Sequence, residues 1–361
     1  MNILMLAWRD MLNPQKGGAE IVTDIYLKGL TNNNKVTLFS SSYKNSKPNE
    51  TYNNYNIIRK GNKLSVYYHG LKFAIHNQNN YDIIIDQVNT IPFFTPLTIP
   101  KNKRVAFFHQ LCKNIWFYET NPISATMGYI AESIYLKLYN NTKTFTVSNS
   151  TKQDLIKHTN NNPNNILVLD NHIDFKPITT KPKNKQNYFI YVGRLKTSKR
   201  IHHIIRAIHN LKNKNIKLII VGDGDTAYKN KLNKLIKKLN LKNQIILTGK
   251  IPNNQRNKLM QNALAIIVTS VREGWGLIVT EANANHTIAI TYNIHGLRDA
   301  NTNHTGFITK ENNPEALAQE MNKVIYDSKL RNEKEVNAMK FAREHSDWEV
   351  NQGRLEGWLK G

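Results

Sequence analysis

Two carboxylates, Glu273 and Glu281, are separated by seven residues in a segment that joins a predicted strand to a predicted helix. The apolar run 263–269 before them predicts a buried parallel strand. Two glycines between the carboxylates permit a tight turn that brings backbone N–H groups close to a ligand. If the helix begins near Leu277, Glu281 lies about one turn in and leans back toward the helix start. Both carboxylates then face one pocket at the carboxyl end of a strand.

Carboxylates above unpaired backbone amides suit a ligand that carries both hydroxyl groups and phosphate. The alternative interpretation is structural. Glu273 would then be a favourable charge at a helix N-terminus, and Glu281 a solvated side chain.

Arg194 and Lys199 provide a second group, on the loop that follows the predicted strand 188–192. Two cations on one strand-to-helix loop, with a helix N-terminus behind them, would neutralise a diphosphate. Chance also places such pairs in a segment this basic. Lys196 and Arg200 lie nearby and can simply be solvated.

Three further features are ambiguous taken singly. The Gly17-Gly18 loop lies between a strand and a helix and suits either a phosphate or an ordinary tight turn. His109 ends a buried strand and could bond a sugar hydroxyl, act as an acid or base, or be a core histidine. Asp223 and Asp225 resemble a metal-binding pair, but an ordinary strand-to-loop turn is favoured. We therefore expect no metal.

The elements that position these residues alternate between short apolar strands and helices, which predicts βαβ units and parallel sheets. Two such runs predict two doubly wound, Rossmann-like α/β domains that face each other across a cleft. We expect an N-terminal domain at 1–174, a linker at 175–187, a C-terminal domain at 188–344, and a last segment, 345–361, that returns to the N-terminal domain.

The composition narrows the class of protein. The chain has 361 residues, room for two domains, and no apolar run long enough to span a bilayer. The single cysteine, Cys112, fits a reducing compartment, so we expect a cytoplasmic protein. The net charge is +24, and segment 181–258 holds twenty Lys and Arg residues against two acids. Nucleic acid, anionic lipid and anionic substrates are candidate partners, but lysines on solvated helix faces are the favoured explanation of the charge.

Taken in order along nearly the whole chain, these motifs resemble those of the family-4 retaining glycosyltransferases of the GT-B fold. The residues that carry the resemblance are Gly17-Gly18-x-Glu20, His109, Gly193-Arg194 with Lys199, Val221-Gly222-Asp223-Gly224, and Glu273-x7-Glu281. The segments Trp8-Arg9-Asp10 and Ile91-Pro92-Phe93-Phe94 are similar to those of a microbial subgroup.

The resemblance implies a role for each matching position. Arg194 and Lys199 would hold the diphosphate of a nucleotide-sugar donor, and Glu281 would bind the ribose hydroxyls. Glu273 and His109 would contact the transferred sugar, and with the two cations they form the expected catalytic set. The expected donor-binding set is Gly17, Gly18, Gly274, Trp275, Gly276, Leu277 and Glu281. No metal or other cofactor is implied. The anomeric configuration would be retained because the acceptor attacks the anomeric carbon on the same face that the leaving phosphate departs from.

Departures from the family pattern concern the nucleotide pocket. Asn171-His172, His286, Ile288 and Asp299 stand where relatives commonly have other residues. None of these changes removes an expected phosphate or sugar ligand. They leave the base of the nucleotide open.

We therefore expect transfer of a hexose to a hydroxyl of a glycan or a lipid-linked acceptor. The aromatic stretches 115–118 and 129–139 predict either a partly basic rim that contacts an anionic membrane or buried helix packing. A soluble sugar acceptor is a further possibility. The alternative from another class is a basic nucleic-acid-binding protein on a degenerate sugar-nucleotide fold, for which a steep salt dependence of binding would be diagnostic.

Overall fold

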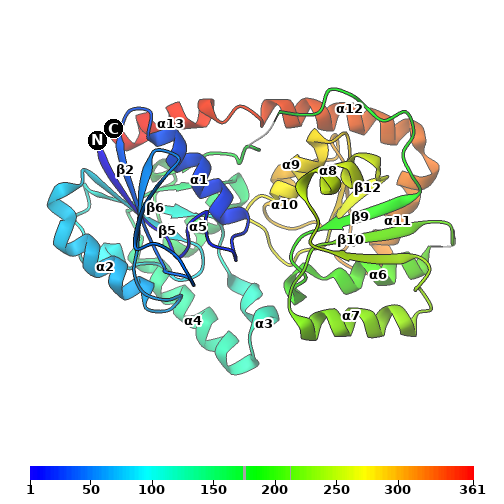
Figure 1. Cartoon of the computed structure of the whole chain (residues 1–361), viewed down its shortest axis with the longest axis horizontal. Helices are drawn as coiled ribbons and strands as arrows, with labels where there is room; N and C mark the ends of the chain where they lie inside the picture. Colours follow the sequence, from blue (N-terminus) through cyan, green and yellow to red (C-terminus); the bar gives the residue numbers. More distant parts are fainter. Residues whose placement is uncertain (174–175, 212) are drawn as a thin grey trace. The chain divides into compact units, whose positions relative to one another are not determined.

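The computed structural model describes residues 1–173, 176–211 and 213–361, and this part of the chain forms two compact units (Figure 1). Unit 1 comprises 1–113, 126–172 and 347–361, and unit 2 comprises 114–125 and 173–346. The predicted boundary residue Asp174 and the first linker residue, Phe175, lie outside the described residues. Each unit is built around one sheet.

Unit 1 contains an eight-stranded sheet in the order β3-β4-β2-β1-β5-β6-β7-β8. All neighbouring pairs are parallel except β3 and β4, which form an antiparallel hairpin at one edge. The strands are β1 (Asn2–Leu6), β2 (Lys35–Ser40), β3 (Asn49–Tyr52), β4 (Tyr55–Arg59), β5 (Ile83–Val88), β6 (Arg104–Phe108), β7 (Lys143–Thr146) and β8 (Ile166–Val168).

Unit 2 contains a six-stranded parallel sheet in the order β11-β10-β9-β12-β13-β14. Its strands are β9 (Tyr188–Val192), β10 (Lys217–Val221), β11 (Ile245–Gly249), β12 (Ala265–Val268), β13 (Ala289–Thr291) and β14 (Phe307–Ile308). The switch in strand order falls between β9 and β12, which is where open α/β sheets bind ligands. Both strands end in loops that carry predicted site residues.

Helices connect the strands in both units. Unit 1 has α1 (Gly18–Leu30), α2 (Val66–Asn77), most of α4 (Pro122–Leu138), α5 (Asn149–Thr159) and α13 (Glu349–Lys360). Unit 2 has α3 (Trp116–Glu119), α6 (Ile201–Asn210), α7 (Thr226–Lys238), α8 (Asn253–Asn262), α9 (Leu277–Ala284), α10 (Leu297–Ala300), α11 (Pro314–Tyr326) and α12 (Ser328–Glu344). A short 3-10 helix, η5 (Thr197–Lys199), precedes α6.

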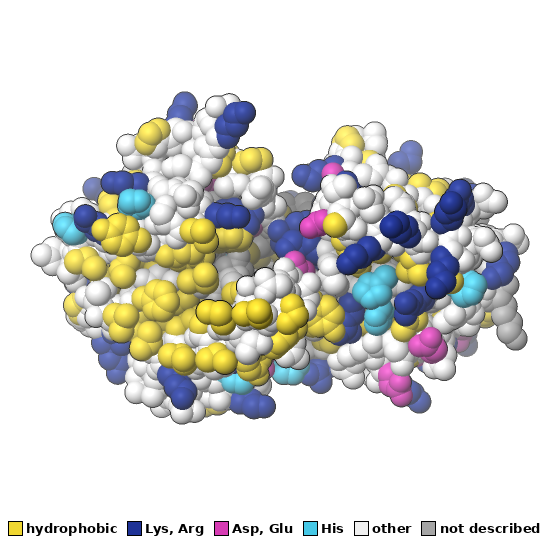
Figure 2. Space-filling model, turned by 90° about the horizontal axis from the view of Figure 1, so that it is seen from below, with side chains coloured by type: hydrophobic (Ala, Val, Ile, Leu, Met, Phe, Trp, Pro, Cys, Tyr) yellow, Lys and Arg dark blue, Asp and Glu magenta, His cyan; other side chains and the backbone are white. Residues whose placement is uncertain are grey.

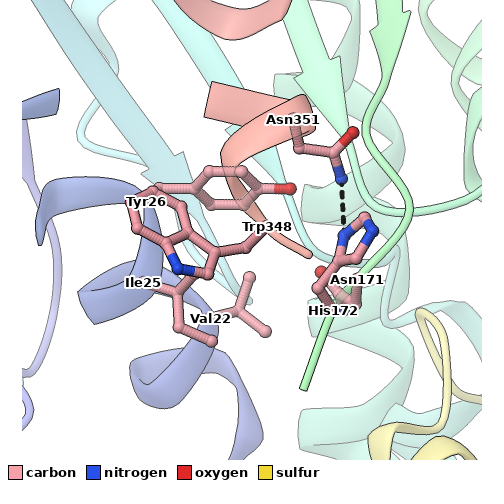
Figure 3. A pocket seen from close by; sticks show the side chains of 7 residues that line it. All are labelled: Val22, Ile25, Tyr26, Asn171, His172, Trp348 and Asn351. Atoms are coloured by element: carbon pink, nitrogen blue, oxygen red, sulfur yellow. Dashed lines mark hydrogen bonds between the residues drawn. The ribbon is translucent and has the colours of Figure 1, made fainter. Parts of the chain in front are cut away.

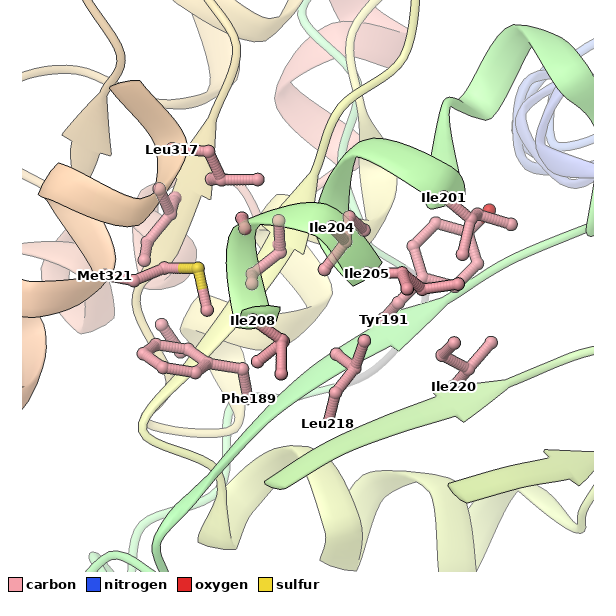
Figure 4. Packing of buried hydrophobic residues seen from close by; sticks show 14 of the residues in the cluster. Phe189, Tyr191, Ile201, Ile204, Ile205, Ile208, Leu218, Ile220, Leu317 and Met321 are labelled. Carbon is pink, nitrogen blue, oxygen red and sulfur yellow. The ribbon is translucent and has the colours of Figure 1, made fainter. Parts of the chain in front are cut away.

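The core of unit 2 explains why α6 lies on its sheet. Apolar residues of α6 recur at helical spacing, and Ile204 and Ile208 are fully buried against Phe189 of β9 and Leu218 of β10 (Figure 4). Met321 of α11 packs into the same cluster. This packing fixes the start of α6, and with it the loop that follows β9.

The last helix, α13, packs on α1 within unit 1. Its Asn351 side chain donates to the backbone carbonyl of Asp170 at 2.6 Å and bonds His172 Nδ1 at 2.8 Å. With Trp348 and α1, these residues surround a small pocket (Figure 3). His172, which departs from the family pattern, thus contacts the C-terminal helix.

Residues 114–125 are assigned differently by sequence and structure. The sequence placed them in the N-terminal domain, whereas in the structure they group with unit 2. The reason is that Glu119 of α3 accepts hydrogen bonds from the Lys196 ammonium at 2.7 Å and the Ser198 amide at 3.2 Å. The described part of the predicted linker also packs on unit 2, where the Lys185 ammonium donates to Thr287 Oγ1 and two backbone carbonyls.

Two smaller observations concern local structure. Ser148 is the N-cap of α5, because its hydroxyl accepts from the Thr151 amide at 3.1 Å. No helix in the described residues has both the length and the apolar character that crossing a bilayer requires.

Candidate functional site

The loop after β9 is held in place by the loop after β10. The Gly193 amide donates to the Val221 carbonyl and the Leu195 amide to the Asp223 carbonyl, both at 3.0 Å. A Cβ at Gly222, which has a φ of +133°, would lie 2.0 Å from the Gly193 carbonyl oxygen. The close approach therefore requires glycine. The glycine-rich motif after β10 thus positions the loop that carries Arg194.

Arg194 is exposed on this loop, and no ion pair or hydrogen bond is recorded for its guanidinium within the described residues. The Tyr191 hydroxyl donates to the Arg194 carbonyl at 2.9 Å. Burial raises the pKa of Tyr191 well above its usual value, the nearby Glu273 charge raises it further, and Arg194 opposes both effects. The charges of Arg194 and Glu273 therefore both act on one buried hydroxyl.

Lys199 and Glu273 are in direct contact. The Lys199 ammonium donates to Glu273 Oε1, and the Ser270 hydroxyl donates to the same oxygen at 2.7 Å. The Val271 amide bonds the Ser198 carbonyl at 2.8 Å, so the backbones of the two loops are also joined. The structure thus brings together one cation and one carboxylate that are 74 residues apart.

The start of α9 offers backbone donors beside Glu273. Gly276 is its N-cap with a φ of +97°, a left-handed conformation that favours glycine. The Leu277 and Ile278 amides have no recorded hydrogen bond within the described residues, as expected in a first helical turn. Such donors suit an anion or a sugar oxygen.

Trp275 was expected in the donor-binding set, but its side chain serves packing. The indole is 3% exposed, donates to Thr280 Oγ1 at 3.1 Å, and stacks on Phe341 and His345. Only the backbone of Trp275 therefore remains suited to contact a ligand. Its packing anchors the loop between Glu273 and α9.

Glu281 lies on α9 and forms an ion pair with Arg256 of α8 at 3.2 Å. Burial raises the pKa of Glu281, and the Arg256 charge partly opposes that rise. The ion pair is made by Glu281 Oε2, which is buried and faces Arg256 Nη2 without the geometry of a hydrogen bond. The carboxylate therefore retains capacity to accept a bond from a ligand hydroxyl. Arg256 was not predicted, since it lies on a different helix and no sequence spacing links it to Glu281.

His109 follows β6 in unit 1 and is 6% exposed. Its Nε2 lies 3.1 Å from Gln87 Nε2 and 3.5 Å from Thr23 Oγ1, and Gln87 also donates to Thr23. Burial lowers the pKa of His109 to about 3, so the ring is neutral at neutral pH. In this orientation the Gln87 amide nitrogen donates to His109 Nε2. The proton of the neutral His109 ring is therefore on Nδ1. This favours hydrogen bonding over acid catalysis. Gln87 and Thr23 were not predicted.

The Gly17-Gly18 loop starts α1, with Gly17 as N-cap. Glu20 accepts from the Gly17 amide at 2.6 Å and from Trp8 Nε1 at 3.0 Å. This arrangement satisfies one amide of the helix start and leaves Gly18 exposed. Gly17, Gly18 and His109 belong to unit 1, whereas the other predicted site residues belong to unit 2.

The two aspartates after β10 have structural partners. Asp225 caps α7 by accepting from the Ala227 amide at 2.7 Å, and Asp223 pairs with Lys229 at 2.6 Å. Among the described residues there is no group of three or more His, Cys, Asp or Glu that could hold a metal ion.

The structure has the GT-B fold, a two-domain α/β architecture with parallel sheets. It is similar to sucrose-phosphate synthase from Thermosynechococcus elongatus, with a TM-score of 0.81 and 16% identity over 99% of this chain and 98% of that one. The Anabaena protein HepE, solved with UDP and glucose, gives a TM-score of 0.76 at 18% identity over 100% and 99% of the two chains.

Residues 173–341, nearly all of unit 2, match the family model described as Glycosyl transferases group 1. An uncharacterized glycosyltransferase of Methanocaldococcus jannaschii is 27% identical over 60% of this chain and 59% of its own length. A Campylobacter jejuni relative, whose name describes transfer of N-acetylgalactosamine to a diphospho-undecaprenol-linked sugar, is 29% identical over 50% of this chain and 49% of its own. The alignments thus span about half the length of these relatives. They do not favour the alternative of a nucleic-acid-binding protein.

Proposed function

We propose that the protein is a retaining glycosyltransferase of the family-4 type, which moves a hexose from a nucleotide-diphosphate sugar to a hydroxyl of a glycan or lipid-linked acceptor. No metal is required in this proposal. Its main support is the convergence of the Arg194–Lys199 loop and the Glu273 loop within unit 2, the unit that matches the family model. The name of the Campylobacter relative supports a lipid-linked acceptor.

The donor would lie along the carboxyl ends of β9 and β12. The free guanidinium of Arg194 and the ammonium of Lys199 would neutralise the diphosphate, and the first-turn amides of α9 would bind oxygens near it. Glu281 would accept hydrogen bonds from ribose hydroxyls, since its carboxylate is ion-paired with Arg256 but accepts no hydrogen bond at Oε2. The Arg256 charge would favour the ionised form of this carboxylate against the effect of burial.

Bond cleavage builds positive charge on the anomeric carbon and negative charge on the leaving phosphate. Arg194 and Lys199 would stabilise that phosphate as its charge grows, which is the dominant electrostatic contribution in this mechanism. The acceptor hydroxyl would attack on the same face and pass its proton to the departing phosphate oxygen. His109, being neutral, would hold a sugar hydroxyl and would not transfer a proton.

A donor screen followed by a turnover assay tests this proposal. UDP-, GDP- and ADP-sugars would first be ranked by the rise in melting temperature they cause, because a ligand that binds the native state stabilises it. Release of the nucleoside diphosphate would then be measured for the wild type, for Arg194→Ala and for the exposed control Arg206→Ala. We expect a loss of about 100-fold or more in Arg194→Ala and little change in the control.

Proton NMR of the glycosidic product would report whether the anomeric configuration is retained, and turnover with a chelator would report metal use. Absence of stabilisation by any nucleotide sugar would contradict the proposal. An inverted product or a chelator-sensitive rate would contradict its retaining or metal-independent part.

A further inference from the structure

Helix α4 is apolar on two opposite faces. Its inner face carries Tyr135 and Leu136, which are buried in a core cluster of unit 1 together with Tyr139, the residue after the helix. Its outer face carries Met127, Ile130 and Ile134, which are 67%, 54% and 63% exposed. The stripe begins at Ile123, which is 76% exposed, so the spacing of four, three and four residues follows one side of the helix. A helix that is apolar all round is normally buried.

Neighbouring elements extend this apolar stripe. Leu64, Tyr68 and Leu97 are 71%, 64% and 63% exposed. Aromatic packing connects α2 to α4: Tyr67 of α2 packs on Phe93 at 5.0 Å, and the adjacent Phe94 packs on Tyr135 of α4 at 6.2 Å.

We call the set Leu64, Tyr68, Leu97, Met127, Ile130 and Ile134 the α2–α4 face. Figure 2 shows hydrophobic side chains gathered in a broad band on the body that contains α2 and α4, with Lys and Arg at the margins. Contiguous exposed patches of this kind mark interaction sites.

The exposed charges on these elements are positive. Residues 60–81 and 87–118 contain no Asp or Glu. The acid of α4, Glu132, is 1% exposed, and its carboxylate accepts from the Cys112 and Lys113 amides at 2.7 Å each. Exposed lysines adjoin the apolar positions: Lys63 precedes Leu64, Lys72 lies one turn after Tyr68, Lys101 follows Leu97 by four residues, and Lys137 lies one turn after Ile134.

We propose that the α2–α4 face docks on an anionic lipid bilayer. Its apolar residues would enter the boundary between headgroups and acyl chains, while the lysines bind lipid phosphates. Tyr68 suits such an interface because its ring is apolar and its hydroxyl is polar. A second copy of the chain is disfavoured, since pairing this face with itself would oppose two basic rims in a protein of net charge +24.

This surface does not depend on the proposed transferase activity, but it gives that activity a location. An enzyme bound to the bilayer surface would encounter a lipid-linked acceptor at that same surface. The binding test therefore measures lipid affinity alone, so its failure would leave the donor chemistry untouched.

The test is flotation of the purified 361-residue chain with lipid vesicles. One vesicle type is phosphatidylcholine alone, and the other contains about one third phosphatidylglycerol. We expect the wild type to float with the anionic vesicles and to be released by high salt. The triple variant Met127→Gln, Ile130→Gln, Ile134→Gln should lose at least about tenfold in vesicle affinity. Gln maintains helix propensity, and the positions are exposed, so the melting temperature should not change.

Two matched controls test whether the apolar residues and the lysines of the α2–α4 face are what binds the vesicles. Ile246→Asn, Tyr326→Asn, Val336→Asn removes three exposed apolar side chains of unit 2 and should bind vesicles like the wild type. Lys63→Gln, Lys72→Gln, Lys137→Gln should lose affinity for anionic vesicles, whereas the same number of changes on α7, Lys231→Gln, Lys234→Gln, Lys238→Gln, should lose much less.

Equal binding by wild type and the α4 variant would overturn the proposal, as would equal binding to neutral and anionic vesicles. Concentration-dependent dimerisation that the α4 variant abolishes, with no vesicle binding by the wild type, would instead identify a second copy as the occupant and would also overturn it.

Discussion

Lys199 and Glu273 form an ion pair that joins the loop after β9 to the loop after β12. Both side chains are partly exposed, 26% and 19%, so the pair contributes little to stability in water. Its significance lies in position: it fixes a cation beside the amides of α9 at the point where the strand order of the sheet switches.

Breaking this pair should therefore affect turnover far more than folding. We expect Lys199→Met and Glu273→Gln each to reduce kcat/KM for the donor by about 100-fold, or about 2.7 kcal/mol of transition-state stabilisation. Urea unfolding should change by less than about 1 kcal/mol. A loss of stability that matches the loss of activity would argue that the pair is only structural.

Arg256 should tune the affinity of Glu281 for a donor. The Arg256 charge lowers the pKa of Glu281 against the rise caused by burial. In Arg256→Gln that pKa should rise further, so donor affinity should begin to fall at a higher pH as the carboxylate becomes protonated. Isothermal titration across pH measures the shift. The exposed neighbour Lys258→Gln on the same helix is the control, and identical profiles for all three proteins would refute the assignment.

Acid should destabilise the fold through His109. Its pKa is about 3 in the folded chain and about 6.5 when unfolded, so between these values the unfolded state binds more protons. Stability should therefore fall as pH drops below about 6.5, by up to about 1.4 kcal/mol per pH unit from this group. His109→Gln should flatten the slope of unfolding free energy against pH. The exposed His209→Gln should leave the slope unchanged.

Glu119 should position the phosphate loop from a distant part of the sequence. Burial raises its pKa, but hydrogen bonds from Lys196 and Ser198 outweigh that effect, so the pKa lies below its usual value. The resulting stabilisation should be lost as pH falls below about 4.5. In Glu119→Gln we expect faster hydrogen exchange at the Ser198 amide and a several-fold higher KM for the donor, with kcat nearly constant. Unaltered exchange would show that the loop holds its shape alone.

Alanine substitutions at two glycines should change the free energy of unfolding in opposite directions. Gly222→Ala would place a methyl against the Gly193 carbonyl and should destabilise unit 2 by about 2 kcal/mol or more. Gly353→Ala, in the exposed middle of α13 with no atom within 4 Å, should stabilise by about 0.5–1 kcal/mol. Chemical denaturation of both variants measures the contrast. If Gly222→Ala left the free energy of unfolding unchanged, the loops after β9 and β10 would be able to separate.

Much of unit 2 could be predicted from sequence because its signals are local. The bounds of β9 match the predicted range 188–192, β12 (Ala265–Val268) lies within the predicted range 263–269, and α9 begins at the expected Leu277. Each of these strands is a short apolar run, and glycines mark the turns after β9 and before α9. The two-domain α/β fold was predicted on the same basis.

Features set by long-range contact could not be predicted. Helix α4 lacks a single apolar face, so its pattern gave no 3.6-residue period to detect. The ion pair of Glu281 with Arg256 and the placement of 114–125 depend on side chains that meet only after folding. The stacking of the Trp275 indole on Phe341 likewise depends on residues that meet only after folding. The roles of the site residues stay predictions.

The return of α13 to unit 1 has a consequence for biosynthesis. Asn33, near the end of α1, donates to Glu356 of α13 at 3.1 Å, and the two residues are 323 positions apart in the sequence. During synthesis unit 1 therefore lacks one of its own helices until all of unit 2 has been made. During that interval the apolar surface of α1 that α13 covers would be open to chaperones.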